Sequence, residues 1–150
     1  MSRKSQKNLK PKEFPKINEV SVVYPLVWKS FENLSLDQKE ELLEQLPTLH
    51  SYYENEESIV LTHKDVGNIY NLGFDYQTIT GICELTLEYD AVYQLESGLF
   101  YNLSKELYWR DITIVDFNTS QNKIWIYVLI KDLTETLEII RTKFIKIKKN

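Results

Sequence analysis

An unbroken apolar run near the C-terminal end constrains the fold more than any other feature. Residues 124–130 are seven apolar residues in succession, IWIYVLI, within the β-rich stretch 111–131. A half-exposed strand alternates apolar and polar residues, whereas a strand covered on both faces reads as a continuous apolar run. We therefore expect residues 124–130 to form a central strand.

A second strand signal covers residues 78–89. The odd positions from Ile79 to Tyr89 are apolar or Gly81, and the even positions are polar except for Ile82. This period of two predicts a long strand with one face on the core and the other wet. Two hairpins are predicted after it, with strands at residues 91–95 and 99–103 and at residues 109–117 and 123–130.

Helices are predicted before these strands. After a short strand at residues 20–24, Pro25 suits the first turn of a helix through Phe31 and Leu34. Ser35 and Gln38 have the spacing of a capping box, which predicts a second helix ended by Pro47. An exposed loop is expected at residues 48–58 and a short helix at residues 62–73.

The C-terminal end is predicted to be helical. Asp132 and Glu135 have capping-box spacing, and apolar residues recur at helical intervals from Leu133 to Ile147, although residues 143–148 fit a helix or a strand. The chain is thus predicted to be α+β, with N-terminal helices, an antiparallel β-meander of about five strands, and a C-terminal helix packed on the sheet. Its domains are a disordered basic tail at 1–17 and a single α+β domain at 18–150.

The charge is unevenly distributed along the chain. The net charge is −4, but residues 1–16 hold six basic residues and one acidic residue, whereas residues 17–131 hold seven basic and eighteen acidic residues. Nucleic acid needs a basic face, so only weak contacts are expected, through the basic side chains of the tail. Those side chains are Arg3, Lys4, Lys7, Lys10 and Lys12. The acidic body favours a basic protein partner.

Cysteine usage and hydropathy indicate the compartment. Cys83 is the single cysteine, so an intramolecular disulfide is excluded and a reducing compartment is expected. No apolar run reaches the ~18 residues of a membrane span. We expect a cytoplasmic protein without membrane association, with the nucleus as the alternative because of the basic tail.

Catalytic and cofactor signatures are weak. Cys83 with His50 or His63 is the single route to a thiol–imidazole pair, and these residues have the spacing of neither that pair nor a zinc site. The four glycines fit no phosphate-binding loop. No catalytic, cofactor-binding or metal-binding residue is therefore predicted. A small metal-dependent nuclease or hydrolase using Asp111 or Asp116 stays as an alternative.

Aromatic residues beside acids provide the candidate site. The chain has 10 tyrosines and 3 tryptophans, and Tyr101, Tyr108 and Trp109 form one group in a predicted edge region. The predicted partner-binding residues are Tyr52, Tyr53, Glu54, Glu56 and Glu57. Tyr and Trp serve as rigid anchors in interfaces, and acids suit a Lys- or Arg-rich target. We expect a non-catalytic interaction protein, such as an inhibitor, an immunity-type protein or an adaptor.

One family resemblance offers another alternative. Phe31-x2-Leu34-x7-Leu42-Leu43-x2-Leu46-Pro47 resembles the helix pair of the deubiquitinase-adaptor domains found in chromatin-associated scaffolds. The segment Leu95-x2-Gly98-x-Phe100 is similar to a later part of those domains. The resemblance implies a helical domain and a nuclear scaffold or adaptor subunit.

Overall fold

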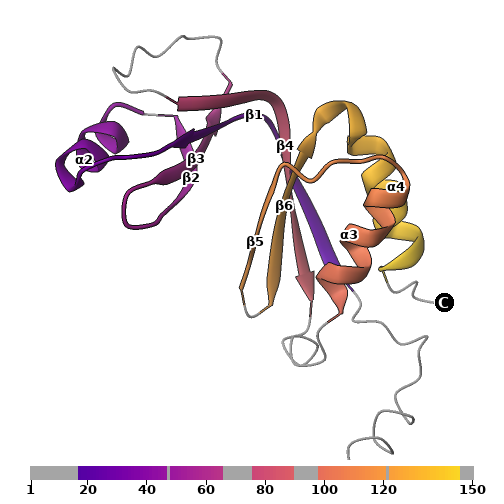
Figure 1. The fold of residues 1–150 in the computed structure, drawn as a ribbon. Coiled ribbons are helices and arrows are strands. Elements are labelled where there is room, and N and C mark those ends of the chain that lie inside the picture. The colour runs from indigo at the N-terminus through magenta and orange to yellow at the C-terminus, as the bar shows by residue number, and fades with distance from the viewer. Residues whose placement is uncertain (1–16, 47, 66–75, 90–97, 121, 146–150) are drawn as a thin grey trace, which may run out of the picture. The chain divides into compact units, whose positions relative to one another are not determined.

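The computed structural model describes residues 17–46, 48–65, 76–89, 98–120 and 122–145. The described elements, in chain order, are β1 (Ile17–Phe31), α2 (Leu36–Glu44), β2 (Leu49–Glu54), β3 (Ile59–Lys64), β4 (Tyr76–Tyr89), α3 (Leu99–Trp109), β5 (Asp116–Thr119), β6 (Lys123–Leu129), the 3-10 turn η2 (Ile130–Asp132) and α4 (Leu133–Lys143) (Figure 1). The strands form an antiparallel sheet in the order β2-β3-β1-β4-β6-β5. The predicted α+β class is confirmed.

The chain divides into two compact units that share their longest strands. The N-terminal unit is Val23–Glu84, and the C-terminal unit is Met1–Val22 with Leu85–Asn150. Strands β1 and β4 each contribute residues to both units. Whether residues 18–150 behave as a single domain, as predicted from the sequence, stays a prediction.

Both units contain a split β-α-β motif. In the N-terminal unit, β1 and β2 are both antiparallel to β3, which lies between them, and α2 connects them. In the C-terminal unit, α3 connects β4 to β5, and β6 lies between these two strands. Two strands joined by a helix with a third strand inserted is the ferredoxin-like arrangement.

The core of the N-terminal unit lies between α2 and the sheet. The buried side chains of this cluster are Phe31, Leu34, Leu42, Leu46, Ile59 and Leu61. The predicted capping box begins the helix, because the Gln38 N–H donates to Ser35 Oγ at 3.2 Å and the Ser35 N–H donates to Gln38 Oε1 at 2.8 Å. The start of α2 is therefore confirmed.

The helix predicted from Pro25 to Leu34 is wrong. Strand β1 runs through this segment, and residues from Leu26 to Phe31 pair one by one with β3. Lys29 shares its strand face with Val27 and Phe31 and is 7% exposed, so a buried lysine interrupts the apolar alternation that marks a strand. Phe31 ends β1 and is not helical, so the helix pair implied by the deubiquitinase-adaptor resemblance is absent from residues 17–46.

Helices α3 and α4 cover the same face of the sheet in the C-terminal unit (Figure 1). Glu106 of α3 accepts from Lys143 of α4 at 2.8 Å. Strand β6 lies between β4 and β5, as expected of a central strand, and its residues Ile124, Ile126 and Val128 are at most 2% exposed. Each such side chain contributes about 1.5–3 kcal/mol by leaving water.

Two segments of the predicted meander have another structure. Residues 99–103 lie in α3, because Leu99, Leu103 and Leu107 recur every four residues and are all buried. Residues 109–115 end this helix and lead to β5, so the strand predicted at 109–117 begins at Asp116. The predicted strand at 91–95 lies outside the described residues.

The remaining predictions divide between confirmed and corrected segments. Strand β4 confirms the prediction for residues 78–89, whereas the loop predicted at 48–58 contains β2. The predicted helix at 62–73 begins in β3 and continues outside the described residues. Tail residues 1–16 also lie outside them.

The C-terminal helix is confirmed as far as Lys143. Beyond α4, Ile145 forms a parallel bridge with Ile17, and the Ile17 N–H donates to the Phe144 carbonyl at 2.8 Å. Residues 146–148 of the segment that was left open lie outside the described part of the chain. None of the described helices has the length and apolar content needed to cross a membrane.

Candidate functional site

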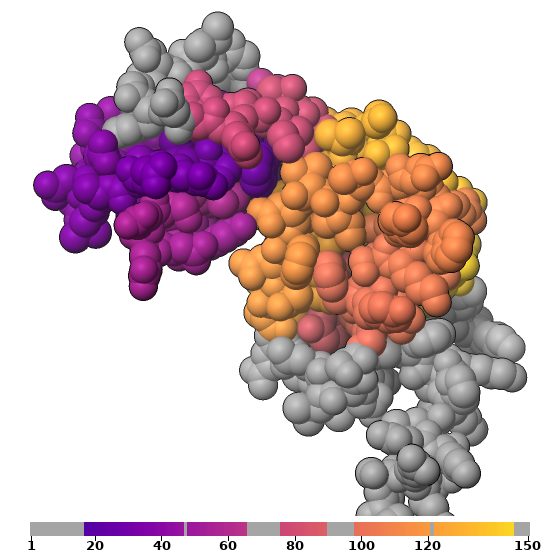
Figure 2. All heavy atoms as spheres, viewed as in Figure 1, coloured from indigo at the N-terminus to yellow at the C-terminus, as the bar shows by residue number. Residues whose placement is uncertain are grey.

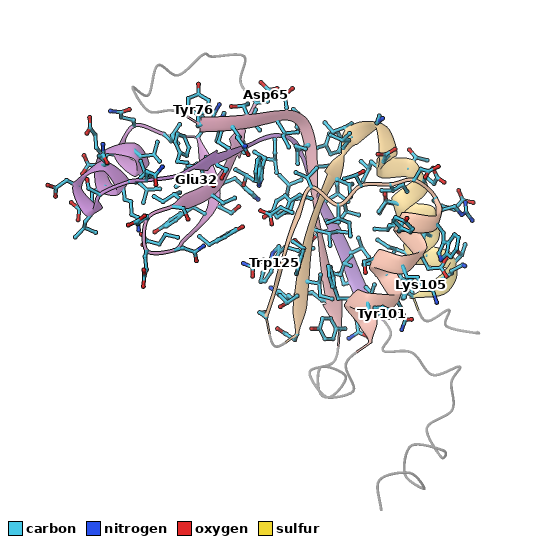
Figure 3. The ribbon with its side chains drawn as sticks, viewed as in Figure 1. Glu32, Asp65, Tyr76, Tyr101, Lys105 and Trp125 are labelled. Atoms are coloured by element: carbon cyan, nitrogen blue, oxygen red, sulfur yellow. The ribbon has the colours of Figure 1, made fainter. Side chains whose placement is uncertain are left out.

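A pocket of about 560 Å³ lies along α3 in the C-terminal unit. Its lining residues are Tyr101, Ser104, Lys105, Tyr108, Asp111, Ile112, Thr113 and Ile114. Figure 2 shows the orange atoms of α3 at the surface of this unit, and Figure 3 labels Tyr101 and Lys105 on the helix. The volume lies within the ~300–1,000 Å³ of small-molecule sites.

The helical period of α3 places these side chains on its outer face. Leu103 and Leu107 are fully buried, whereas Tyr101 is 67% and Tyr108 is 76% exposed. Tyr101, Lys105 and Tyr108 are spaced four and three residues apart, so they follow one stripe of the helix. The same amphipathic pattern therefore fixes α3 on the sheet and presents two phenol rings and an ammonium group outward.

The C-terminal end of α3 positions the acidic group of the pocket. Asp111 has a φ of 59°, and its N–H donates to the Tyr108 carbonyl at 3.1 Å. The Ile112 N–H donates to the Leu107 carbonyl at 3.0 Å, which completes a Schellman motif with Asp111 in the left-handed position. Gly is preferred there because a Cβ atom costs about 1 kcal/mol in this conformation.

Two opposite charges in the lining have no ion-pair partner among the described residues. The neighbouring charges on α3 are paired, Glu106 with Lys143 and Arg110 with Glu135 at 3.5 Å, whereas Lys105 and Asp111 are in no ion pair. The C-terminal carbonyls of a helix carry partial negative charge, which adds to the attraction of Asp111 for a cation. Lys105 supplies the attraction for an anion.

Hydroxyl and apolar groups complete the lining. Ser104 Oγ donates to the Tyr101 carbonyl at 3.0 Å, which leaves its lone pairs available to a ligand. Thr113 adds a second hydroxyl, and Ile112 and Ile114 add apolar surface. The pocket therefore combines one cation, one anion, hydroxyls and a hydrophobic wall.

The residues considered for thiol or metal chemistry have structural environments. Cys83 is fully buried in β4, and His50 Nε2 lies 3.1 Å from Glu84 Oε1. Burial lowers the pKa of His63, whose Nδ1–H donates to the Lys64 carbonyl at 2.9 Å. Within the described ranges, no group of three His, Cys, Asp or Glu side chains is arranged to hold a metal ion.

The carboxylates of β4 and β5 have partners within the structure. Glu84 is 5% exposed, so the expectation that its strand face is wet fails at this position, whereas Glu88 pairs with Lys123 at 3.2 Å near the surface. Asp116 Oδ1 accepts from the Phe117 N–H at 2.8 Å in β5. Asp111, the other residue of the nuclease alternative, lies in the α3 pocket.

The predicted partner-binding residues belong to the N-terminal unit, whereas the α3 pocket belongs to the C-terminal unit. Tyr52 and Tyr53 are 49% and 39% exposed on β2, which ends at Glu54, and Glu56 and Glu57 follow in the turn to β3. Lys39 holds this turn, since its Nζ lies 3.4 Å from the Glu54 carboxylate and donates to backbone carbonyls of the turn. A partner-binding role for these five residues stays a prediction.

The sequence identified part of the α3 pocket. It singled out Tyr101 and Tyr108 as aromatic residues and Asp111 as a carboxylate, but it missed Lys105. The usable signal was the spacing of Tyr101, Lys105 and Tyr108, which becomes visible once the segment is read as a helix.

Comparisons with known proteins reveal similar structures. No protein-family model matches the sequence, and no curated protein matches it. The chain is similar to the ligand-free regulatory subunit of aspartate kinase from Thermus thermophilus, with 8% identity, a TM-score of 0.65, and 85% of this chain and 99% of that chain covered.

Two whole enzymes also contain a similar part. Clostridium acetobutylicum aspartate kinase has a TM-score of 0.71 at 9% identity, over 91% of this chain and 36% of that chain. Escherichia coli aspartokinase III, in complex with lysine and aspartate in the T-state, has a TM-score of 0.61 at 11% identity, over 91% and 35%. At such identities the likeness establishes the fold alone.

The function predicted from the sequence is wrong. The similar structures are regulatory domains of a kinase, whereas the predictions were an inhibitor, immunity-type or adaptor module, a chromatin-associated scaffold subunit, or a small nuclease or hydrolase. Those predictions relied on composition and on an exposed aromatic segment. Neither observation bears on the fold that this chain shares with those structures.

Proposed function

We propose that this chain is a non-catalytic regulatory domain that binds a small zwitterion, an amino acid, in the pocket along α3. The carrying observation is that Lys105 and Asp111 line one pocket with opposite charges and have no ion-pair partner among the described residues. A free α-amino acid carries the complementary pair, an ammonium group and a carboxylate group attached to the same carbon atom.

Each end of the ligand has a suitable group. The ammonium group binds the Asp111 carboxylate next to the carbonyl end of α3, and the carboxylate group binds Lys105. Tyr101 and Tyr108 flank these charges on the helix, and Ile112 and Ile114 contact the apolar part of the ligand. Hydrogen bonds to charged groups contribute about 1.5–3 kcal/mol, and an open pocket favours the lower end of that range.

The similar structures support a regulatory role. The Thermus thermophilus protein that this chain matches over 99% of that protein's length is a regulatory subunit, and the aspartokinase III complex contains lysine and aspartate. By this likeness, we propose that the chain acts on a separate catalytic partner in the cytoplasm. Ligand binding then changes the affinity for that partner, or its activity, through a coupling free energy.

Titration calorimetry of the full chain against the twenty amino acids tests the proposal. We expect one or a few to bind, and Lys105→Met and Asp111→Asn each to weaken binding about 5- to 30-fold, or about 1–2 kcal/mol. Lys131→Met removes an exposed lysine of the same unit outside the pocket and serves as the matched control. Equal binding by all four proteins, or no binding of any amino acid, argues against the proposal.

A further inference from the structure

A second pocket, of about 290 Å³, lies in the N-terminal unit and has different chemistry. Its lining residues are Ser30, Glu32, Asn33, Tyr76 and Gln77, from the end of β1, the residues after it and the start of β4. Figure 3 labels Glu32 and Tyr76. The volume is just below the ~300–1,000 Å³ range of ligand sites, which suits a molecule of a single ring.

The polar side chains of this pocket are available to a ligand. Glu32 is in no ion pair with a described residue, and within the described ranges the side chains of Ser30, Asn33 and Gln77 make no hydrogen bond. Carboxamides and hydroxyls both donate and accept hydrogen bonds, whereas a carboxylate only accepts them. The set therefore matches a ligand whose groups donate and accept in equal measure, as alcohol hydroxyls do.

The backbone holds these groups in place before any ligand binds. Asn33 has a φ of 59°, a left-handed conformation that Asn tolerates better than most residues. The following Leu34 N–H donates to the Glu57 carbonyl at 2.8 Å and fixes the end of this turn against the β2–β3 connection. A pre-organised site loses less entropy on binding.

The Tyr76 ring is an apolar wall that is also held in position. The ring centroid lies 5.1 Å from that of Phe31 at an interplanar angle of 44°, and Lys29 Nζ lies 4.3 Å from the Tyr76 centroid. Lys29 is fixed in turn because its ammonium donates to Thr78 Oγ1 at 3.2 Å. The ring is thus held by two contacts and does not have to be ordered by the ligand.

The charged residues in and beside this pocket determine the charge of the ligand that it can bind. The lining contains no Lys, Arg or His, and its charged residue is Glu32, so an anion is repelled. A cationic amine is repelled by the Lys29 ammonium, which lies 4.3 Å from the Tyr76 ring centroid. A single carboxylate is also too few for a divalent cation, which takes several oxygen ligands. What remains is a neutral molecule.

We propose that this pocket binds a neutral polyhydroxyl compound, a monosaccharide or cyclic polyol. The Glu32 carboxylate accepts from two neighbouring hydroxyls, the amides of Asn33 and Gln77 exchange hydrogen bonds with others, and the C–H face of the ring packs on Tyr76. This site lies in the other unit from the amino-acid pocket and goes beyond the function proposed above.

Saturation-transfer NMR on the full chain tests this site with glucose, galactose, mannose and myo-inositol as ligands. We expect at least one to bind with a dissociation constant on the order of 1 mM, since a small ligand has few contacting atoms. Glu32→Gln is expected to weaken binding about tenfold. Asn33→Gly is expected to weaken it while keeping the fold, because Gly suits the left-handed conformation.

Matched variants and competing ligands decide the outcome. Asp37→Asn, an exposed acid on α2 outside the pocket, is expected to leave binding unchanged, and so is Lys105→Met in the other pocket. Absence of binding by all four polyols overturns the proposal, as does binding that survives both Glu32→Gln and Asn33→Gly. Stronger binding of ethylammonium or acetate at this pocket also overturns it. If Lys105→Met loses amino-acid binding but keeps polyol binding, the loss concerns the α3 pocket and leaves the polyol proposal standing.

Discussion

Lys39 of α2 donates from Nζ to the backbone carbonyl of Glu56 at 2.8 Å, although the residue is only 6% exposed. The same Nζ donates to the Asn55 carbonyl. A buried ammonium thus satisfies carbonyls that a tight turn leaves without partners. These bonds hold the acidic turn between β2 and β3 to α2.

Replacing Lys39 by Met should destabilise the N-terminal unit. The apolar chain length is kept, but buried carbonyls lose their donor, which costs about 1–3 kcal/mol. Urea unfolding followed by tryptophan fluorescence, to which Trp28 of the same unit contributes, measures this loss. Lys131→Met is the control, and a loss equal to that of the control would show that the turn does not depend on Lys39.

Replacing Ser35 by Ala should also destabilise α2, by about 1 kcal/mol. The Gln38 N–H loses its acceptor and the reciprocal capping box is broken. Ser35→Asp keeps an acceptor at the N-cap and should restore most of the stability. Thermal unfolding of the three proteins checks the order, and an Asp variant no more stable than the Ala variant would be inconsistent with capping.

Replacing Asp111 by Gly should separate stability from ligand binding. Gly adopts a φ of 59° without the Cβ penalty, so we expect the free energy of unfolding to rise by up to about 1 kcal/mol. The same change removes the carboxylate proposed to bind the ligand ammonium. Calorimetry should therefore detect weaker amino-acid binding by a more stable protein. A variant that is both less stable and unaltered in binding contradicts both parts of this reasoning.

His63 should make stability depend on pH. Burial lowers its pKa from the ordinary value of 6.5, so the folded chain keeps the imidazole neutral. This contribution is present above pH 6.5 and is lost as pH falls from 6.5 through the folded-state pKa, because the unfolded chain then binds a proton that the folded chain does not. The slope is at most about 1.4 kcal/mol per pH unit for one proton.

Unfolding free energies at about pH 7.5 and pH 5 measure this effect. His63→Asn keeps a side-chain N–H near the position of Nδ1 and removes the titration, so its stability should change less between the two pH values. If both proteins lose the same free energy, another group is responsible.

Strands with a strong local pattern were predictable, and segments with two valid patterns were not. Residues 78–89 alternate over twelve positions, and residues 124–130 are uniformly apolar, so each admits one interpretation. Leu99 and Leu103 fit either a short strand or a helix. Their burial with Leu107 decides for the helix, and this burial depends on contacts with α4 and the sheet that a local pattern does not contain.

The candidate sites were less predictable because their key features break local rules. Asp111 occupies a left-handed position where Gly is the usual signal, so the sequence did not mark the end of α3. Lys29 is buried among apolar neighbours and interrupts the alternation of β1. Asp111 adopts a backbone conformation that its residue type disfavours, and Lys29 is buried because of contacts with residues distant in the sequence, so a local pattern predicts neither.

The sharing of β1 and β4 between the two units limits how the chain can be shortened. A fragment that begins at Leu85 lacks residues 17–22, and with them the Ile17 contacts to Phe144 and Ile145. The C-terminal half of β4 would keep β6 as a neighbour but lose β1, so it would become an edge strand with one open side, prone to pairing with other chains. The C-terminal unit is therefore not a continuous stretch of sequence, because it includes residues 17–22 of β1 as well as the residues after Glu84.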